Sequence, residues 1–261
     1  MGRSERSRPK KRLGQHFLND PNTARVIARG VEEDDIILEI GPGRGALTTV
    51  LAERARMIHT VEVDPDVIPT LEDTLKPRQN VLIHQGDALA FDYASLDPRP
   101  NKLVANLPYN IASTLVLKLL EEADFLAELR FMVQLEVARR VAAQKRTKDY
   151  GSYTVLVQLL AAACLVHRVS PLVFDPPPRV WSAIVVARRR EIAFEDYDRA
   201  KRLVLAAFKS RRKRLVNNLP ETLRETSVDA LRSLGYRLDT RAEELGPEDF
   251  VALSRFLSER A

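Results

Sequence analysis

The 261-residue chain has little cysteine and histidine and no long apolar segment. Its single cysteine, Cys164, excludes an intrachain disulfide and gives no reason to expect an oxidising compartment. The longest apolar stretch, residues 155–166, is interrupted by Gln158 and is shorter than the ~18 residues of a membrane span. The basic N-terminus is not followed by the apolar core of a secretory signal. The histidines lack metal-ligand spacing, so we expect a metal-free cytoplasmic protein: His16, His59, His84 and His167.

Positive charge is modest in total but concentrated in two segments. Lys and Arg number 41 against 36 acidic residues, for a net charge of +5. The first cluster lies within residues 3–12 and the second within residues 209–214. Clustered cations indicate a polyanionic partner. The alternatives are a solubilising tail for the first cluster and a solvated helix face for the second.

Short apolar runs alternate with helical patterns up to about residue 190. We predict strands at 36–40, 57–63, 81–84, 102–105, 129–135, 165–169 and 183–187. Helices are predicted at 21–31, 46–54, 66–75, 111–121 and 136–145. This alternation indicates right-handed βαβ units and a parallel sheet. Strand-like runs disappear afterwards, so we expect a basic arm at 1–20, an α/β domain at 21–190 and a small helical domain at 191–261.

The first predicted strand leads into a glycine-rich turn, Glu39-Ile40-Gly41-Pro42-Gly43-Arg44-Gly45-Ala46. Glycines at this place let the backbone approach a ligand closely and direct helix amides at it. Gly41, Gly43 and Ala46 fit a dinucleotide pattern, whereas Gly41, Gly43 and Gly45 suit a methyl-donor loop. Glu62 closes the second strand, where an acid can accept hydrogen bonds from the ribose hydroxyls of an adenosine cofactor.

Two further strand ends carry polar groups. Asp87, followed by Ala88, is an acceptor suited to the amino group of a cofactor adenine, although Gly-Asp is also a common turn. The fourth predicted strand ends in Asn106-Leu107-Pro108-Tyr109-Asn110. The side-chain oxygen of Asn106 and the carbonyl of Leu107 can accept both hydrogens of an aromatic amine, which localises its lone pair. Pro108 stiffens the loop and Tyr109 offers a face on which a base can stack.

Five segments, taken together, resemble the small-subunit ribosomal RNA adenine dimethyltransferases, the KsgA family: Lys11–Leu18, Glu39–Gly45, Asn106–Asn110, Phe174–Ser182 and Phe208–Lys213. The resemblance covers nearly the whole chain in the right order and spacing. It implies a Rossmann-like class I methyltransferase domain with a mostly parallel seven-stranded sheet and a C-terminal all-α domain. The implied reaction is dimethylation of two adjacent adenosines near the 3′ end of 16S rRNA, with S-adenosylmethionine as methyl donor.

The resemblance also implies site residues and partners. The expected donor site is His16, Leu18, Gly41, Gly43, Gly45, Glu62, Asp87, Ala88 and Asn106. The expected base site is Asn106, Leu107, Pro108, Tyr109 and Phe174, with Phe174 either stacking on the target base or anchoring the core. The expected RNA contacts are Lys10, Lys11, Arg12, Arg211, Arg212, Lys213 and Arg214. We expect a monomer that acts on 16S rRNA in an immature small subunit.

Two departures from the family pattern stand out. His16 lies where the family often has Asn, and Trp181 where it more often has a small or acidic residue. Three other functions remain open at this stage. They are a large-subunit rRNA adenine methyltransferase of the macrolide-resistance type, a non-catalytic RNA-binding assembly factor and a nicotinamide oxidoreductase. The last leaves Tyr109 and Phe174 without a role.

Overall fold

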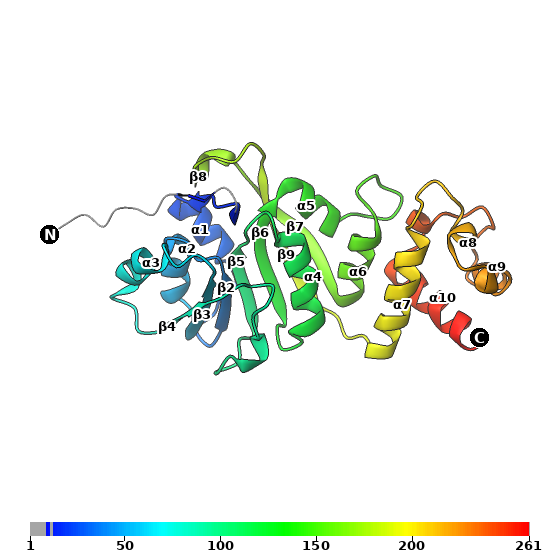
Figure 1. The fold of residues 1–261 in the computed structure, drawn as a ribbon, viewed down its shortest axis with the longest axis horizontal. Helices are drawn as coiled ribbons and strands as arrows, with labels where there is room; N and C mark the ends of the chain where they lie inside the picture. The colour runs from blue at the N-terminus through cyan, green and yellow to red at the C-terminus, as the bar shows by residue number, and fades with distance from the viewer. Residues whose placement is uncertain (1–8, 11–12, 261) are drawn as a thin grey trace. The chain divides into compact units, whose positions relative to one another are not determined.

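The computed structural model describes residues 9–10 and 13–260, which form two compact units (Figure 1). The first contains the described residues up to Ala138 together with Cys164–Arg189. The second contains Arg139–Ala163 and the described residues from Arg190 onward. Residues 139–163 therefore group with the C-terminal helices rather than with the sheet. Within the described residues, no helix is long and apolar enough to cross a membrane.

The central element is a seven-stranded sheet in the order β4-β3-β2-β5-β6-β9-β7. Its strands are β2 (Ile36–Ile40), β3 (Met57–Glu62), β4 (Val81–Gln85), β5 (Lys102–Asn106), β6 (Glu128–Gln134), β7 (Ala161–Val169) and β9 (Ser182–Arg189). Strands β2 to β6 pair in parallel, and β9 runs antiparallel to β6. The predicted mostly parallel seven-stranded sheet is confirmed.

Helices of the first unit lie on both faces of this sheet. Figure 1 shows α1 (Pro21–Ile27), α2 (Ala46–Ala52) and α3 (Ile68–Leu75) on one face and α4 (Ala112–Glu122) on the other. The Asp20 carboxylate caps α1 by accepting a hydrogen bond from the Thr23 backbone at 2.7 Å, as its sequence suggests. Helix α1 ends at Ile27, earlier than the expected residue 31, because the following turn contains Gly30 with a φ of +79°.

The chain changes direction across the sheet between β2 and β5. Strands β3 and β4 follow β2 outward on one side, whereas β5 and β6 continue on the other. At such a switch point the loops after neighbouring strands part, and they leave a crevice at the carboxyl ends of the strands. The glycine turn after β2 and the Asn106–Asn110 loop after β5 therefore face the same crevice.

The longest apolar stretch divides between two kinds of structure. Residues up to Leu160 form α6 (Ser152–Leu160), which follows α5 (Leu135–Val141), and β7 begins at Ala161. Only the second half was predicted as a strand, and α6 was missed. A short apolar run fits a buried helix as well as a strand, so periodicity could not separate them. The Gln158 amide, which interrupts the apolar stretch, is satisfied by donating to the carbonyls of Val141 and Ala143.

Helices of the second unit pack on a small core of their own. These are α6, α7 (Phe194–Ala207), α8 (Leu215–Asn218), α9 (Arg224–Ser233) and α10 (Pro247–Ser258), with α10 packed on α7 and α6. The Phe208 ring contacts the rings of Tyr150 and Phe250, at centroid distances of 6.2 and 5.9 Å. The all-α character expected after residue 191 is confirmed.

The basic segment 209–214 is a turn between α7 and α8, so its interpretation as a helix was wrong. The Asn218 side chain holds the turn by donating to the carbonyls of Ala207 and Ser210 at 2.6 and 2.9 Å. The first bond satisfies the carbonyl of Ala207, the last residue of α7, which the end of the helix leaves free.

Candidate active site

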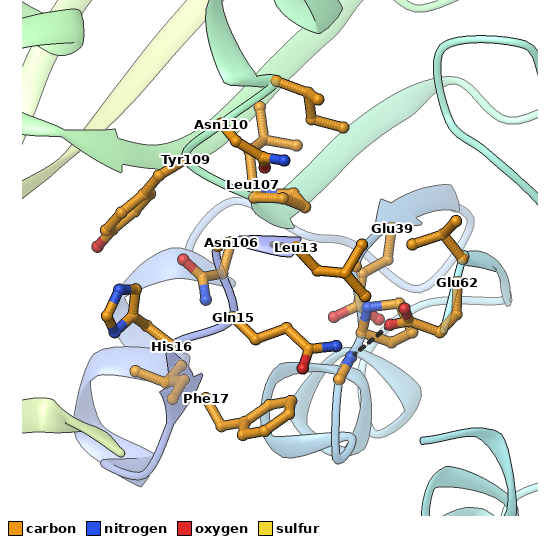
Figure 2. Close-up of a pocket in the computed structure, with 18 of the residues that line it drawn as sticks. Leu13, Gln15, His16, Phe17, Glu39, Glu62, Asn106, Leu107, Tyr109 and Asn110 are labelled. Carbon is orange, nitrogen blue, oxygen red and sulfur yellow. Dashed lines mark hydrogen bonds between the residues drawn. The ribbon is translucent and has the colours of Figure 1, made fainter. Parts of the chain in front are cut away.

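A cavity of about 200 Å³ lies at the carboxyl ends of β2, β3 and β5. A buried water needs only about 10–15 Å³ on this scale, so the space holds an organic molecule. The lining residues come from five parts of the chain: Leu13–Leu18, Glu39–Leu47 without Ile40 and Gly45, Glu62 with Val63, Asp87 with Leu89, and Asn106–Ile111. Figure 2 shows Glu39 and Glu62 on one side of the pocket and His16, Asn106 and Tyr109 on the other.

Two glycines of the turn after β2 are required by close packing as well as by backbone conformation. Gly41 and Gly43 have φ of +69° and +57°. A Cβ at Gly41 would lie 3.2 Å from Pro108, and one at Gly43 would lie 2.9 Å from the Phe17 ring. Gly45 does not line the cavity; a Cβ there would meet Leu71 of α3 at 3.1 Å. The absence of a side chain at Gly45 lets the start of α2 lie close to Leu71.

Glu62 and Glu39 place two buried carboxyl groups at one end of the cavity. Glu62 Oε2 accepts a hydrogen bond from the Gly43 amide at 3.3 Å, drawn dashed in Figure 2, and Oε1 accepts from the Asp64 amide at 2.9 Å. Burial raises the pKa of Glu62 above its usual value in spite of these bonds. Burial, and secondarily the nearby Glu62 charge, raises the pKa of Glu39 to about 8. The sequence analysis assigned no role to Glu39, because this residue precedes the glycines and belongs to a strand in which only a structural role was expected.

Asp87 lies at the cavity lining after β4, and Ala88 is buried behind it. The Asp87 Oδ1 accepts a hydrogen bond from the Leu89 amide at 2.9 Å, and the Asp87 carbonyl accepts one from Ala90. Asp87 therefore forms the turn that its Gly-Asp sequence suggested. Its carboxylate is exposed and retains lone pairs for a ligand.

The segment before α1 crosses the cavity. Residues Phe17–Leu18 form β1, which pairs antiparallel with β8 (Phe174–Asp175). The His16 Nδ1 lies 2.7 Å from the carbonyl of Pro176, so this nitrogen carries the proton and donates. The backbone of Gly14, with a φ of +62°, lies against the Asn110 side chain. This segment brings the predicted residues His16 and Leu18 into the lining.

Gln15 and Lys10 fasten this segment to the end of β3. Lys10 forms ion pairs with Asp64 and Asp66, each at 2.6 Å, and Gln15 donates to the other oxygen of Asp64. These ion pairs give Lys10 a structural role that its assignment to RNA did not include. Lys11 and Arg12 lie outside the described residues. Spacing between a lysine and two acids more than fifty residues later gave no sign of this network.

The last residue of β5, Asn106, has the one side-chain oxygen of the predicted base site that lacks a hydrogen-bond partner among the described residues. Asn106 Oδ1 is buried, and no described residue donates a hydrogen bond to it. The Tyr109 hydroxyl forms a hydrogen bond with the Ser182 hydroxyl, and burial raises the pKa of Tyr109. Leu107 and Pro108 also line the cavity. A buried acceptor without a hydrogen bond destabilises the fold. Such a group is typical of a binding site whose ligand supplies the missing donor.

Phe174 does not line the cavity. Its side chain is 4% exposed in the hydrophobic core, and its ring meets Tyr109 in a T-shaped contact at 6.4 Å. In the described structure Phe174 is therefore a core residue, the second of the two interpretations, and its ring packs against the Tyr109 ring. The strand pairing of β8 with β1, invisible in the sequence, draws Phe174 inward.

The predicted phosphate contacts in the second unit are of two kinds. Arg211 donates to the Glu243 carboxylate at 2.6 Å and to the carbonyls of Thr147 and Lys148. Its guanidinium is thus occupied within the protein. Arg212, Lys213 and Arg214 are exposed, and no ion pair joins them to another described residue.

A doubly wound sheet with an acid at the end of β3 and a glycine turn at its switch point defines a Rossmann-like nucleotide-cofactor fold. Residues 6–259 match the ribosomal RNA adenine dimethylase family. The chain belongs to this family.

Relatives and solved structures agree with this assignment. The chain is 63% identical over 251 residues to ribosomal RNA small subunit methyltransferase A of Rubrobacter xylanophilus, which covers 96% of both chains. Identity to the protein of the same name in Neisseria gonorrhoeae is 39%, covering 97% of both. A dimethyladenosine transferase from Plasmodium falciparum superposes with a TM-score of 0.80 at 26% identity, covering 91% of this chain and 96% of that one. The 23S rRNA methyltransferase ErmE follows at 0.74 and 29%, covering 93% and 99%.

Proposed function

We propose that this chain transfers methyl groups from S-adenosylmethionine to the N6 amines of two adjacent adenosines in the 3′-terminal hairpin of 16S rRNA, within an immature small subunit. The observation that carries the proposal is the buried, unpartnered Asn106 Oδ1 in a pocket that Glu62 and Tyr109 also line. The small-subunit enzymes are the better match. This chain is 63% identical to the small-subunit methyltransferase of Rubrobacter xylanophilus and 29% identical to the 23S rRNA methyltransferase ErmE.

The residues present fit the methyl donor. Gly41 and Gly43 form a cradle without side chains, and a Cβ at either would crowd the loop or the Phe17 ring. Glu62 would accept hydrogen bonds from the ribose hydroxyls, and Asp87 from the adenine amine. His16 and Leu18 would close the methionine side. When bound, S-adenosylmethionine supplies a methyl group on a positively charged sulfonium.

Asn106 and Leu107 would orient the target amine. The lone pair of an adenine amine is delocalised into the ring, so the amine is a poor nucleophile. Hydrogen bonds to the Asn106 Oδ1 and the Leu107 carbonyl would hold both amine hydrogens and aim the nitrogen at the methyl group. Both acceptors gain strength as positive charge develops on nitrogen, which stabilises the transition state.

Tyr109 would bind the flipped adenine by stacking. Its hydroxyl is tied to Ser182, and Phe174 packs against its ring, so the ring is held in one orientation. The stacking predicted for Phe174 itself requires that RNA binding uncover its ring. The methylated nitrogen releases its extra proton to solvent, since an N-alkylated adenine amine bearing that proton is strongly acidic. The chain therefore needs no dedicated general base.

The proposal includes a monomeric cytoplasmic enzyme that holds rRNA phosphates through Arg212, Lys213 and Arg214, with Lys11 and Arg12 of the arm. Small subunits from a strain lacking this modification, incubated with labelled S-adenosylmethionine and the chain, should gain two dimethyladenosines. Mass spectrometry of the isolated 16S rRNA locates them. Label in large-subunit rRNA alone would replace the small-subunit function by the macrolide-resistance type. Absence of transfer with intact RNA binding would favour a non-catalytic assembly factor.

The donor site has a separate test. Glu62→Ala should weaken S-adenosylmethionine binding by about 1–3 kcal/mol, because ribose hydroxyls would lose a charged acceptor. Calorimetry on the isolated chain measures this without RNA. Unchanged affinity would show that the ribose is held elsewhere.

A further inference from the structure

Trp181, the only tryptophan of the chain, is 52% exposed in the first unit. The side chain before it, Val180, is also exposed, at 45%. Arg179 is exposed too, and no ion pair joins it to another residue of the described chain. Adjoining exposed apolar side chains next to a charged one are typical of a binding surface, whereas single exposed apolar residues are common.

The backbone of Trp181 is held in place beside the candidate active site. Its carbonyl accepts a hydrogen bond from the Leu135 amide at 2.9 Å. The next residue, Ser182, pairs with Gln134 of β6 and forms the hydrogen bond to the Tyr109 hydroxyl. Upstream, three consecutive prolines limit the backbone of residues 176–178. Trp181 is thus one residue away from a direct contact of the proposed base-binding ring.

We propose that Trp181 is a second base-binding site, which stacks on a nucleobase next to the target adenosine while Arg179 binds a phosphate of the same strand. The proposal rests on the function proposed above. A flipped base leaves its neighbours unstacked, and an exposed aromatic ring can replace the lost stacking without reading the sequence.

Charge favours an RNA strand over a protein partner as the occupant. Arg179 places an exposed positive charge two residues before the exposed Trp181 ring, and a cation with an aromatic ring is the pairing that tracks a nucleic-acid backbone with its bases. The Trp181 backbone also adjoins Ser182, the buried residue whose hydroxyl contacts the Tyr109 hydroxyl. A base bound at Trp181 therefore belongs to the same strand as the base bound at Tyr109.

A single tryptophan makes the proposal directly measurable, because intrinsic indole emission comes from position 181 alone. The probe is a synthetic 16S hairpin with two adjacent loop adenosines, titrated into the full chain. We expect quenching by this RNA and weaker quenching by a hairpin with an abasic site beside the target adenosine. S-adenosylmethionine alone should leave the emission unchanged.

Substitutions give an independent readout. Trp181→Ala should raise the KM for RNA by roughly 5- to 30-fold and leave single-turnover kcat at saturating RNA within about 3-fold, while Trp181→Phe recovers most of the affinity. Arg179→Ala should lower the salt slope of RNA binding by about 0.7. Leu172→Ala is the matched control, since Leu172 is 86% exposed in the same unit. It should change neither quantity.

The outcomes separate this proposal from the function itself. Two results together would overturn the stacking site and leave the proposed function intact: wild-type emission that RNA does not quench, and a Trp181→Ala variant with an unchanged KM for RNA and normal methylation. RNA quenching in a chain that transfers no methyl group would support the stacking site and overturn the proposed function.

Discussion

The side-chain amide of Gln15 donates a hydrogen bond to the Asp64 carboxylate, with 2.8 Å between Nε2 and Oδ2. Asp64 is 1% exposed, and its other oxygen holds Lys10. Its backbone amide donates to Glu62. Although burial alone would raise it, hydrogen bonds from Lys10 and Gln15 hold the pKa of Asp64 below its usual value. Asp64 therefore joins the segment that crosses the cavity to the carboxylate proposed to bind ribose.

This connection predicts that Asp64 is a positioning residue for donor binding. Asp64→Ala should weaken S-adenosylmethionine binding by about 1–3 kcal/mol, because Gln15 and Lys10 lose a buried charged partner. Asp66→Ala is the control: Asp66 also pairs with Lys10, but its side chain is 67% exposed. An exposed pair contributes less than about 1 kcal/mol. Calorimetry compares the two, and equal losses would mean that only the charge near Lys10 matters.

Asn106→Ala should reduce single-turnover methylation by roughly 100- to 1000-fold, which is the usual effect of losing one polar transition-state stabiliser. RNA affinity should stay within a few-fold. No described residue donates a hydrogen bond to Asn106 Oδ1, so removing this oxygen should not lower the melting temperature of the variant. Assays use small subunits with saturating donor. Near-normal turnover would reduce the Asn106–Asn110 loop to a structural turn.

Tyr109 provides a contrasting pair of variants. Tyr109→Phe keeps the ring and removes only the hydrogen bond to Ser182, so base binding should fall slightly. Tyr109→Ala removes the stacking face and should weaken RNA binding by about 1–3 kcal/mol as well as slow the reaction. KM and kcat for RNA measure the difference. Equal effects would mean that the hydroxyl, rather than the ring, is the important group.

Glu39 should make the stability of the ligand-free chain fall as pH rises. Burial raises the pKa of Glu39 from 4.5 to about 8, so between these values the folded chain holds a proton that the unfolded chain has lost. Stability from this group is complete below pH 4.5 and is lost as pH rises to 8. Glu39→Gln stays neutral and should be more stable at pH 8 by up to about 5 kcal/mol, at ~1.4 kcal/mol per pKa unit.

Denaturant unfolding of both forms at pH 5, 6.5 and 8 checks this. Glu62 also has a raised pKa, so the difference between the two chains, rather than either curve, isolates Glu39. If the unfolding free energies of the two chains change with pH in parallel, Glu39 is ionised in the folded chain and the prediction is wrong. Donor binding measured on the same samples separates stability from function.

Arg211 and its neighbours should behave differently toward RNA. Arg212→Ala with Lys213→Ala should lower the slope of log affinity against log salt by about 1.5, since each lost phosphate contact removes ~0.7–0.9. Arg211→Ala should leave the slope unchanged and destabilise the second unit, because its guanidinium binds Glu243 and two carbonyls. Filter binding across a salt series and thermal melts measure both. A slope lowered by Arg211→Ala alone would reverse this division.

Much of the molecule followed from residues that are close in sequence. Alternating apolar runs predicted the strands from β2 to β6, and Asp20 before Pro21 predicted the start of α1. The glycine turn after Ile40 and the loop after Asn106 could be placed at one edge of the sheet, because parallel strands end on the same side. These predictions succeeded because backbone periodicity, caps and turns depend on neighbouring residues.

Tertiary structure alone decided which side chains have partners. Gln15 and Asp64 are 49 positions apart, and Arg211 binds carbonyls 63 and 64 residues away. Lys10 and Arg211 carry the same charge as their neighbours in the chain, yet each forms an ion pair with a carboxylate, whereas no ion pair joins Lys213 to another described residue. Sequence determined where the polar groups lie along each element; only folding, which brings distant elements together and removes water between them, determined which groups are satisfied and which, like Asn106, remain open to a ligand.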